Sequence, residues 1–147
     1  MAFTDRLRQQ HDQAATAAQQ LRCLVGDHRP GGDALAITIQ LARLFSGLRA
    51  HLAEEERCLY PALTATNDCS AAELAEQDHQ EAGSLAWDWE EFMRRWSSSA
   101  LIASSFASFE ASLDRLLGAL EARIACEEAT LFPVADALFP DRQDKAA

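Results

Sequence analysis

The sequence predicts an all-α protein, folded as an antiparallel up-down-up-down four-helix bundle. Apolar residues recur every three to four positions along four long stretches, which is the period of an amphipathic helix. All four prolines lie near the predicted ends of these stretches, so none interrupts a helix interior. Short connections between the stretches favour antiparallel neighbours. At 147 residues with 48% hydrophobic content, the chain is expected to form one domain over residues 1–147.

The first two helices are predicted on either side of a glycine-rich loop. The first runs from about Thr4, as N-cap, to Val25, with Gly26 as its stop. Asp33 is expected to cap the second helix, which ends around Pro61. Their inward-facing residues are Phe3, Leu7, His11, Ala14, Ala18, Leu21 and Val25 in the first helix, and Ile37, Leu41, Leu44, Leu48, His51, Glu55 and Leu59 in the second.

The other two helices are predicted on either side of a short serine turn at residues 97–99. Ser70 and Glu73 have the spacing of a capping box, which predicts the start of the third helix. Phe132-Pro133 is expected to end the fourth helix, with one further turn over residues 134–139. Their inward-facing residues are Ala75, His79, Ala82, Ala86, Trp89, Met93 and Trp96 in the third helix, and Leu113, Leu116, Leu120, Arg123 or Ile124, Glu127 and Leu131 in the fourth.

Histidines and carboxylates on these inward faces predict a metal site inside the bundle. Residues four apart on a helix share a face, so His51 and Glu55 can bind one ion together. At about 1.5 Å per residue, an antiparallel bundle brings the candidate ligands to the same end. A lone histidine on an apolar face is more often a hydrogen-bonded core residue, but three at one level favour ligation. The candidate ligands are His11, His51, Glu55, His79 and Glu127.

Four segments spanning nearly the whole chain resemble those of a known family. They are Gln9 to Asp12, HLAEEERCLYP from residue 51, Asp78-His79, and CEEATLFP from residue 126. Together they resemble hemerythrin-like, or HHE cation-binding, domains. This resemblance implies an antiparallel four-helix bundle with two irons bridged by two carboxylates. It implies that His11 and His51 hold one iron, and that Glu55 and Glu127 are the bridges.

The resemblance is incomplete at the second iron, where only His79 matches. A family histidine one turn later falls on Gly83, and the histidine that opens the last H-x-x-x-E motif falls on Arg123. A guanidinium cannot ligate a metal, but it can replace a cation by pairing with buried carboxylates. Two states therefore remain open. Either one divalent ion binds the matching ligands with Arg123 alongside, or Arg123 neutralises a metal-free site.

The leading functional hypothesis is a non-catalytic protein that binds iron, or another divalent metal such as zinc or manganese. It would sense, store or carry the metal or a small gas ligand such as dioxygen. The alternative is a degenerate, metal-free bundle that acts as an interaction or regulatory module. An enzyme acting on peroxide or nitric oxide at a single iron ranks last, because the sequence shows no separate acid–base pair or substrate pocket.

Charge and composition narrow the expected partners. A net charge of -10 argues against binding to nucleic acid and to anionic membranes, since both would repel an acidic surface. The first residues lack the apolar core of a signal peptide, and no stretch reaches the roughly 20 apolar residues of a membrane span. We therefore expect a cytoplasmic protein.

Cysteines and tryptophans give two smaller expectations. The four cysteines lack the spacing of a disulfide framework, so we expect reduced thiols, with Cys58 and Cys126 as small buried residues. Trp87 and Trp89 are two residues apart and cannot both face inward. One of them would suit the surface of a homodimer.

Overall fold

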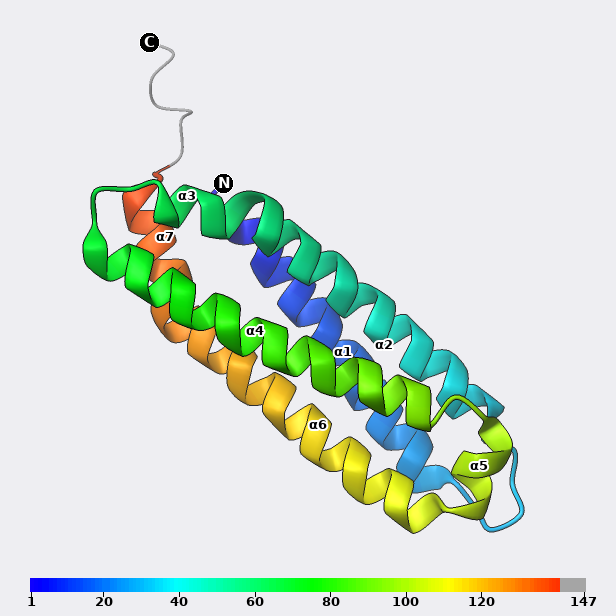
Figure 1. Cartoon of the computed structure of the whole chain (residues 1–147). Helices are drawn as coiled ribbons and strands as arrows, with labels where there is room; N and C mark the ends of the chain where they lie inside the picture. The colour runs from blue at the N-terminus through cyan, green and yellow to red at the C-terminus, as the bar shows by residue number, and fades with distance from the viewer. Residues whose placement is uncertain (141–147) are drawn as a thin grey trace.

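The computed structural model describes residues 1–140, and within this range it contains helices and loops but no strand. The predicted all-α class is confirmed. Four long helices lie side by side (Figure 1). They are α1 (Asp5–Asp27), α2 (Leu35–Glu54), α4 (Cys69–Arg95) and α6 (Phe106–Cys126). The last residues of the expected domain, 141–147, lie outside the described part of the chain.

Short helices sit at both ends of the bundle (Figure 1). The N-terminus and the connection from α2 to α4 lie at one end, and the α1–α2 loop and the connection from α4 to α6 lie at the other. The short helices are α3 (Tyr60–Thr64) and α7 (Phe132–Leu138) at the first end, and α5 (Ser99–Ser104) at the second. Of the helices in residues 1–140, none is long and apolar enough to cross a membrane.

Two wide π-helical turns continue the second and fourth long helices. They are η1 (Glu55–Leu59) and η2 (Glu127–Leu131). Each begins at a buried glutamate and ends directly before an aromatic–proline pair. Here the backbone N–H of Tyr60 bonds to the oxygen of Glu55, five residues earlier, and Phe132 bonds to Glu127 in the same way. Such turns occur mostly as single interruptions of α-helices and are frequent at functional sites.

The second helix continues to Thr64, three residues beyond the end expected around Pro61, and the expected break at Phe132-Pro133 is wrong, while the further turn expected over residues 134–139 is present in α7. A proline ring normally clashes with the carbonyl four residues earlier and ends the helix. Both prolines instead lie in the first turn of α3 and α7, where a missing N–H is tolerated. The wide turn in front of each proline lets the chain stay helical to Thr64 and to Leu138.

Helix α4 also begins differently from the prediction. Asp68 is its N-cap, and its Oδ1 accepts a hydrogen bond from the backbone N–H of Ala71 at 3.0 Å. The helix therefore starts before the expected capping box at Ser70, because an aspartate at the N-cap satisfies the same free amides. The expected role of Asp33 is partly met, since its Oδ1 accepts from the N–H of Leu35 at 2.8 Å.

A layer of buried polar side chains separates two apolar clusters. In α1 and α4, and in α2 and α6 taken together with the π turns that follow them, buried polar residues lie between residues of one cluster and residues of the other. The larger cluster contains Leu21, Leu41, Leu44, Trp89 and Phe109, and the smaller contains Leu7, Leu59, Leu63, Ala75, Leu131 and Phe132. The polar layer contains His11, His51, Glu55, Asp78 and Glu127.

The cysteines lie on the surface, so the expectation that Cys58 and Cys126 are buried is wrong. Cys126 directly precedes the buried Glu127, and helical neighbours point about 100° apart. Cys58 lies within η1, where the wider turn moves it away from the inward face. Trp89 is buried and Trp87 is 63% exposed, so only one of this pair faces inward, as expected.

Asp136 on α7 connects this helix to the start of α1. Its Oδ1 accepts hydrogen bonds from the backbone N–H and the hydroxyl of Thr4, both at 2.9 Å. Its Oδ2 pairs with Arg8 at 2.9 Å. Burial alone would raise the pKa of Asp136, but the hydrogen bonds from Arg8 and Thr4 outweigh it and lower the pKa. The negative charge of Asp136 therefore stabilises the fold.

Replacing Asp136 by asparagine should lower the free energy of unfolding by about 1 kcal/mol at pH 7. The folded pKa lies below the unfolded value, so this contribution is present above pH ~4 and is lost as the pH falls through the folded pKa. Urea unfolding at pH 7 and pH 3 measures it. Asp12→Asn, at an exposed position on α1, is the matched control. A difference of equal size at both pH values would contradict the role of the charge.

Candidate metal centre

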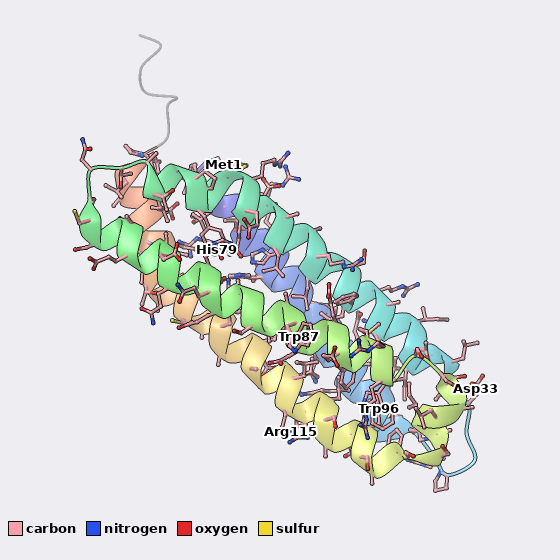
Figure 2. All side chains as sticks on the ribbon, viewed as in Figure 1. Met1, Asp33, His79, Trp87, Trp96 and Arg115 are labelled. Carbon is pink, nitrogen blue, oxygen red and sulfur yellow. The ribbon has the colours of Figure 1, made fainter. Side chains whose placement is uncertain are left out.

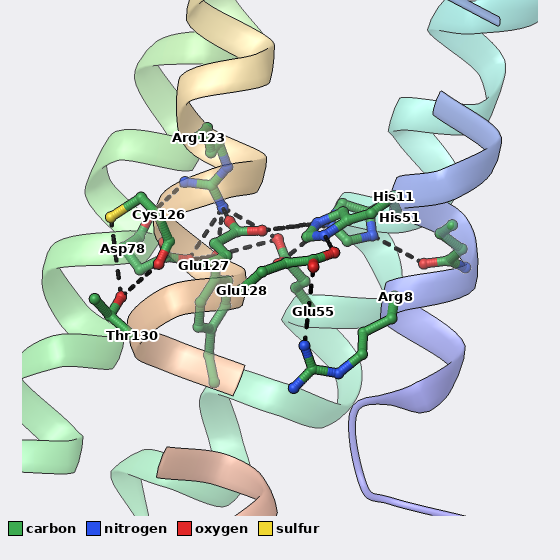
Figure 3. A network of polar contacts seen from close by, with 12 residues as sticks. Arg8, His11, His51, Glu55, Asp78, Arg123, Cys126, Glu127, Glu128 and Thr130 are labelled. Atoms are coloured by element: carbon green, nitrogen blue, oxygen red, sulfur yellow. Dashed lines mark hydrogen bonds and ion pairs between the residues drawn. The ribbon is translucent and has the colours of Figure 1, made fainter. Parts of the chain in front are cut away.

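Three buried side chains converge between α1, α2 and η2 (Figure 3). The Nε2 atoms of His11 and His51 lie 3.2 Å apart. The Oε2 atom of Glu127 lies 3.0 Å from Nε2 of His11 and 3.8 Å from Nε2 of His51. These two nitrogens and one oxygen are close enough together to hold a single cation.

Both imidazoles are oriented by hydrogen bonds on their far side. Nδ1 of His11 lies 2.9 Å from Oε1 of Glu128, and Nδ1 of His51 lies 2.9 Å from Oε1 of Gln10. Carboxylate and amide oxygens accept, so each Nδ1 donates its N–H. Each Nε2 is therefore the atom that faces the centre, the arrangement that second partners impose on metal-binding histidines. Sequence reasoning missed both partners, although each is adjacent to a predicted ligand.

A second group of carboxylates surrounds Arg123. Its Nη2 atom lies 3.0 Å from Oδ2 of Asp78 and 3.3 Å from Oε2 of Glu55, and it pairs with Oε1 of Glu127. Its Nη1 donates to the backbone oxygen of Asp78 at 3.0 Å. The hydroxyl of Tyr60 accepts from Nη2 at 3.1 Å and donates to Oδ2 of Asp78 at 2.8 Å. The guanidinium thus lies among three carboxylates that could otherwise hold a cation.

The structure brings four of the five expected ligands to this centre, but not His79. The side chain of His79 is 43% exposed, and its Nε2 pairs with Glu56 outside the polar layer. It lies on α4 near the end of the bundle that carries α3 and α7 (Figure 2). Its ring packs beside Tyr60, with centroids 4.7 Å apart. The preceding residue, Asp78, contributes the inward-facing side chain of α4 instead.

The predicted inward face of α4 is confirmed at Ala75, Ala82, Trp89 and Trp96 but is wrong at His79. The observed face includes Asp78 and Phe92, while Met93, predicted inside, is only partly buried. A face through Leu85 and Phe92 presents larger apolar side chains than one through Ala86. That difference in size was the signal that could have placed Asp78 inside and His79 outside.

The charges around His51 favour a cation at this position. Burial alone would lower the pKa of His51, but hydrogen bonds with Glu127 and Glu55 outweigh it and raise the pKa to about 9. Burial would raise the pKa of Glu127, yet hydrogen bonds from His11 and His51 and the charge of Arg123 lower it to about 2. Both shifts show that positive charge is stabilised between these side chains.

Arg123 does not fully compensate the carboxylates on its side. Burial and the charge of Glu127 raise the pKa of Asp78 to about 6, although Arg123 acts in the opposite direction. Burial and the charges of Glu55 and Asp78 also raise the pKa of Tyr60, so its hydroxyl stays protonated and donates. The centre therefore carries more negative than positive formal charge.

Carboxylate oxygens with ion-pair contacts but no well-directed hydrogen bond provide a test of whether a metal ion fits. Oε1 of Glu55 and both carboxylate oxygens of Glu127 are buried without a hydrogen bond of normal geometry, despite their short ion-pair distances. A buried acceptor without a donor costs about 1–3 kcal/mol. A cation beside these oxygens and the two Nε2 atoms would satisfy them. Two imidazoles and two carboxylates suit iron, manganese and zinc, so the side chains fit such an ion.

A family model described as "Hemerythrin HHE cation binding domain" matches residues 2–135. The searches of curated proteins and of solved structures found no match. The matched range contains all of the side chains that form the centre, and the buried histidine and carboxylate groups could hold a metal ion. This protein belongs to the hemerythrin HHE cation-binding family.

Proposed function

We propose that this protein is an antiparallel up-down-up-down bundle that binds one iron ion and carries or senses a small gas ligand such as dioxygen. The observation that supports it is the pair of imidazoles of His11 and His51. Their Nδ1 atoms are held by Glu128 and Gln10, and their Nε2 atoms meet at 3.2 Å beside carboxylate oxygens that lack a hydrogen bond of normal geometry. A cation between these nitrogens and oxygens would satisfy both sets of atoms.

Each side chain of the centre has a role in this proposal. His11 and His51 would supply two nitrogens, and Glu127 and Glu55 would supply oxygens. Iron bound there would supply reversible binding of a diatomic molecule at an open coordination position. A cavity of about 140 Å³ is lined by both histidines and by Glu127, so a gas molecule has room beside these ligands.

Arg123 limits the centre to one ion in this proposal. Its guanidinium contacts the three carboxylates that would hold a second ion, and it stays protonated because their charges outweigh its burial. His79, the matching imidazole for a second ion, faces outward. The positive charge of Arg123 takes the place of the second metal in balancing Glu55 and Glu127.

A metal-free interaction module is the second candidate, and the same ion pairs of Arg123 favour it. Three carboxylates already have a partner without any metal. In this case the histidines would serve only as core residues. The metal content of the purified protein distinguishes the two candidates.

Protein purified without chelator should contain about one iron per chain by elemental analysis. His51→Ala should weaken metal affinity by ~10-fold or more, because it removes a ligand where even outer partners contribute that much. His79→Ala is the matched control and should retain the wild-type metal content, because His79 lies outside the centre. Equal and negligible metal in wild type and His51→Ala would remove the proposal.

Arg123→His should raise the metal content from about one to about two ions per chain, since it replaces a fixed positive charge with a nitrogen ligand. Arg123→Lys is the control, because it keeps the charge and offers no ligand while protonated. Elemental analysis after loading with excess iron gives the count. A count that stays at one in Arg123→His would show that Arg123 is not what excludes the second ion.

A further inference from the structure

The cavity beside the metal centre is larger than a diatomic gas requires. Its volume is about 140 Å³, close to that of an engineered cavity of about 150 Å³ that binds benzene. Most of its wall is apolar and comes from α2, α4 and α6, with His11, His51 and Arg123 at its polar end. The apolar wall includes Phe45, Leu48, Leu85, Trp89, Leu120 and Ile124. The dimensions suit a single small ring.

Trp89 in this wall has a buried donor without an acceptor. Its side chain is 2% exposed, and its Nε1 has no hydrogen-bond partner among the residues that the structure describes. The indole stacks with Phe45 at a centroid distance of 6.4 Å and meets the edge of Phe92 at 6.1 Å. A ligand with one acceptor atom would supply the missing hydrogen bond.

The cavity reaches the surface between α2 and α4. Arg49 and Glu90 both line it, and their side chains, 66% and 57% exposed, pair at 3.5 Å across the two helices. The guanidinium of Arg49 also lies 4.8 Å from the ring centroid of Phe45. An exposed ion pair of this kind is weak, so it can open for a ligand without disturbing the core.

The charges at the polar end exclude an anionic ligand. The carboxylates of Glu55, Asp78 and Glu127 outnumber the single guanidinium of Arg123, which is already bound to all three. We propose that this cavity binds a small, neutral, largely apolar organic molecule with one hydrogen-bond acceptor directed at Trp89 Nε1. The cavity is the one assigned above to a gas ligand, so this proposal adds a second kind of occupant, whose binding requires neither metal nor gas.

Two probes of nearly equal shape test the proposal. Cyclohexanone offers a carbonyl acceptor, and methylenecyclohexane replaces that oxygen with CH₂. The wild-type protein should bind cyclohexanone about fivefold to tenfold more tightly, the difference that one hydrogen bond of about 1 kcal/mol or slightly more produces. Titrations followed by NMR of ¹⁵N-labelled protein give both affinities and report the indole N–H of Trp89 directly.

Three variants test whether the indole N–H of Trp89 causes the preference for cyclohexanone. Trp89→Phe keeps an aromatic ring but removes the N–H, so it should make the two affinities equal. Trp87→Phe, at the exposed neighbouring tryptophan, should leave both affinities unchanged. Ala86→Leu, in the wall of the cavity, should weaken both probes by filling space. The shift of the Trp89 N–H signal in wild type tests the hydrogen bond even where Trp89→Phe fails to fold.

Failure of the proposal is separable from failure of the metal function. The titrations are run on protein as purified and after removal of metal with a chelator. Preference for cyclohexanone in both samples supports the cavity site, whatever the metal content. Absence of binding by both probes, or equal affinities with no shift of the Trp89 N–H, would overturn it.

Discussion

The structure depends on keeping buried carboxylates next to positive charge. Glu55, Asp78 and Glu127 lie in the middle of an apolar bundle, where an uncompensated charge would be expelled or protonated. Arg123 provides a permanent cation on one side, and the imidazoles of His11 and His51 provide nitrogens on the other. The π turns begin at Glu55 and Glu127, α4 supplies Asp78, and the hydroxyl of Tyr60 adds a donor to this group.

Helices α2 and α6 place Glu55 and Glu127 through the same sequence pattern. HLAEEERCLYP and RIACEEATLFP carry a cationic or imidazole residue, then a glutamate four positions on, then a π turn and an aromatic–proline pair. His51 and Arg123 are equivalent positions in these two segments. Among the differences between the two segments, the ring nitrogen of His51 against the guanidinium of Arg123 is the one that bears on metal ligation, because a guanidinium offers no lone pair.

The helical period and the level of the ligands along the bundle could be predicted from sequence. Apolar spacing defines each long helix, and antiparallel packing brings His11, His51, Glu55 and Glu127 together without knowledge of any contact. The choice between Asp78 and His79 could not be made in this way, because a rotation of about 100° exchanges them. The larger apolar side chains on the observed face of α4 give one signal for Asp78, and pairing with Arg123 and Tyr60 provides the tertiary contacts that hold it inside. The helical path beyond Pro61 and Pro133 likewise depends on turns that a regular period does not contain.

The position of the polar layer between two apolar clusters also sets how far the four long helices are shifted along the bundle axis relative to one another. Each long helix contributes at least one ionisable side chain to this layer, counting the π turn that follows it where there is one. Apolar residues lie on both sides of that side chain along the same helix. Shifting any one helix along its axis by one turn would bury a carboxylate or imidazole among apolar side chains. The residues that pair with it would then lose their partner. The polar layer therefore specifies the axial register of the helices. Aliphatic packing alone would tolerate a shift in this register, but the layer destabilises it.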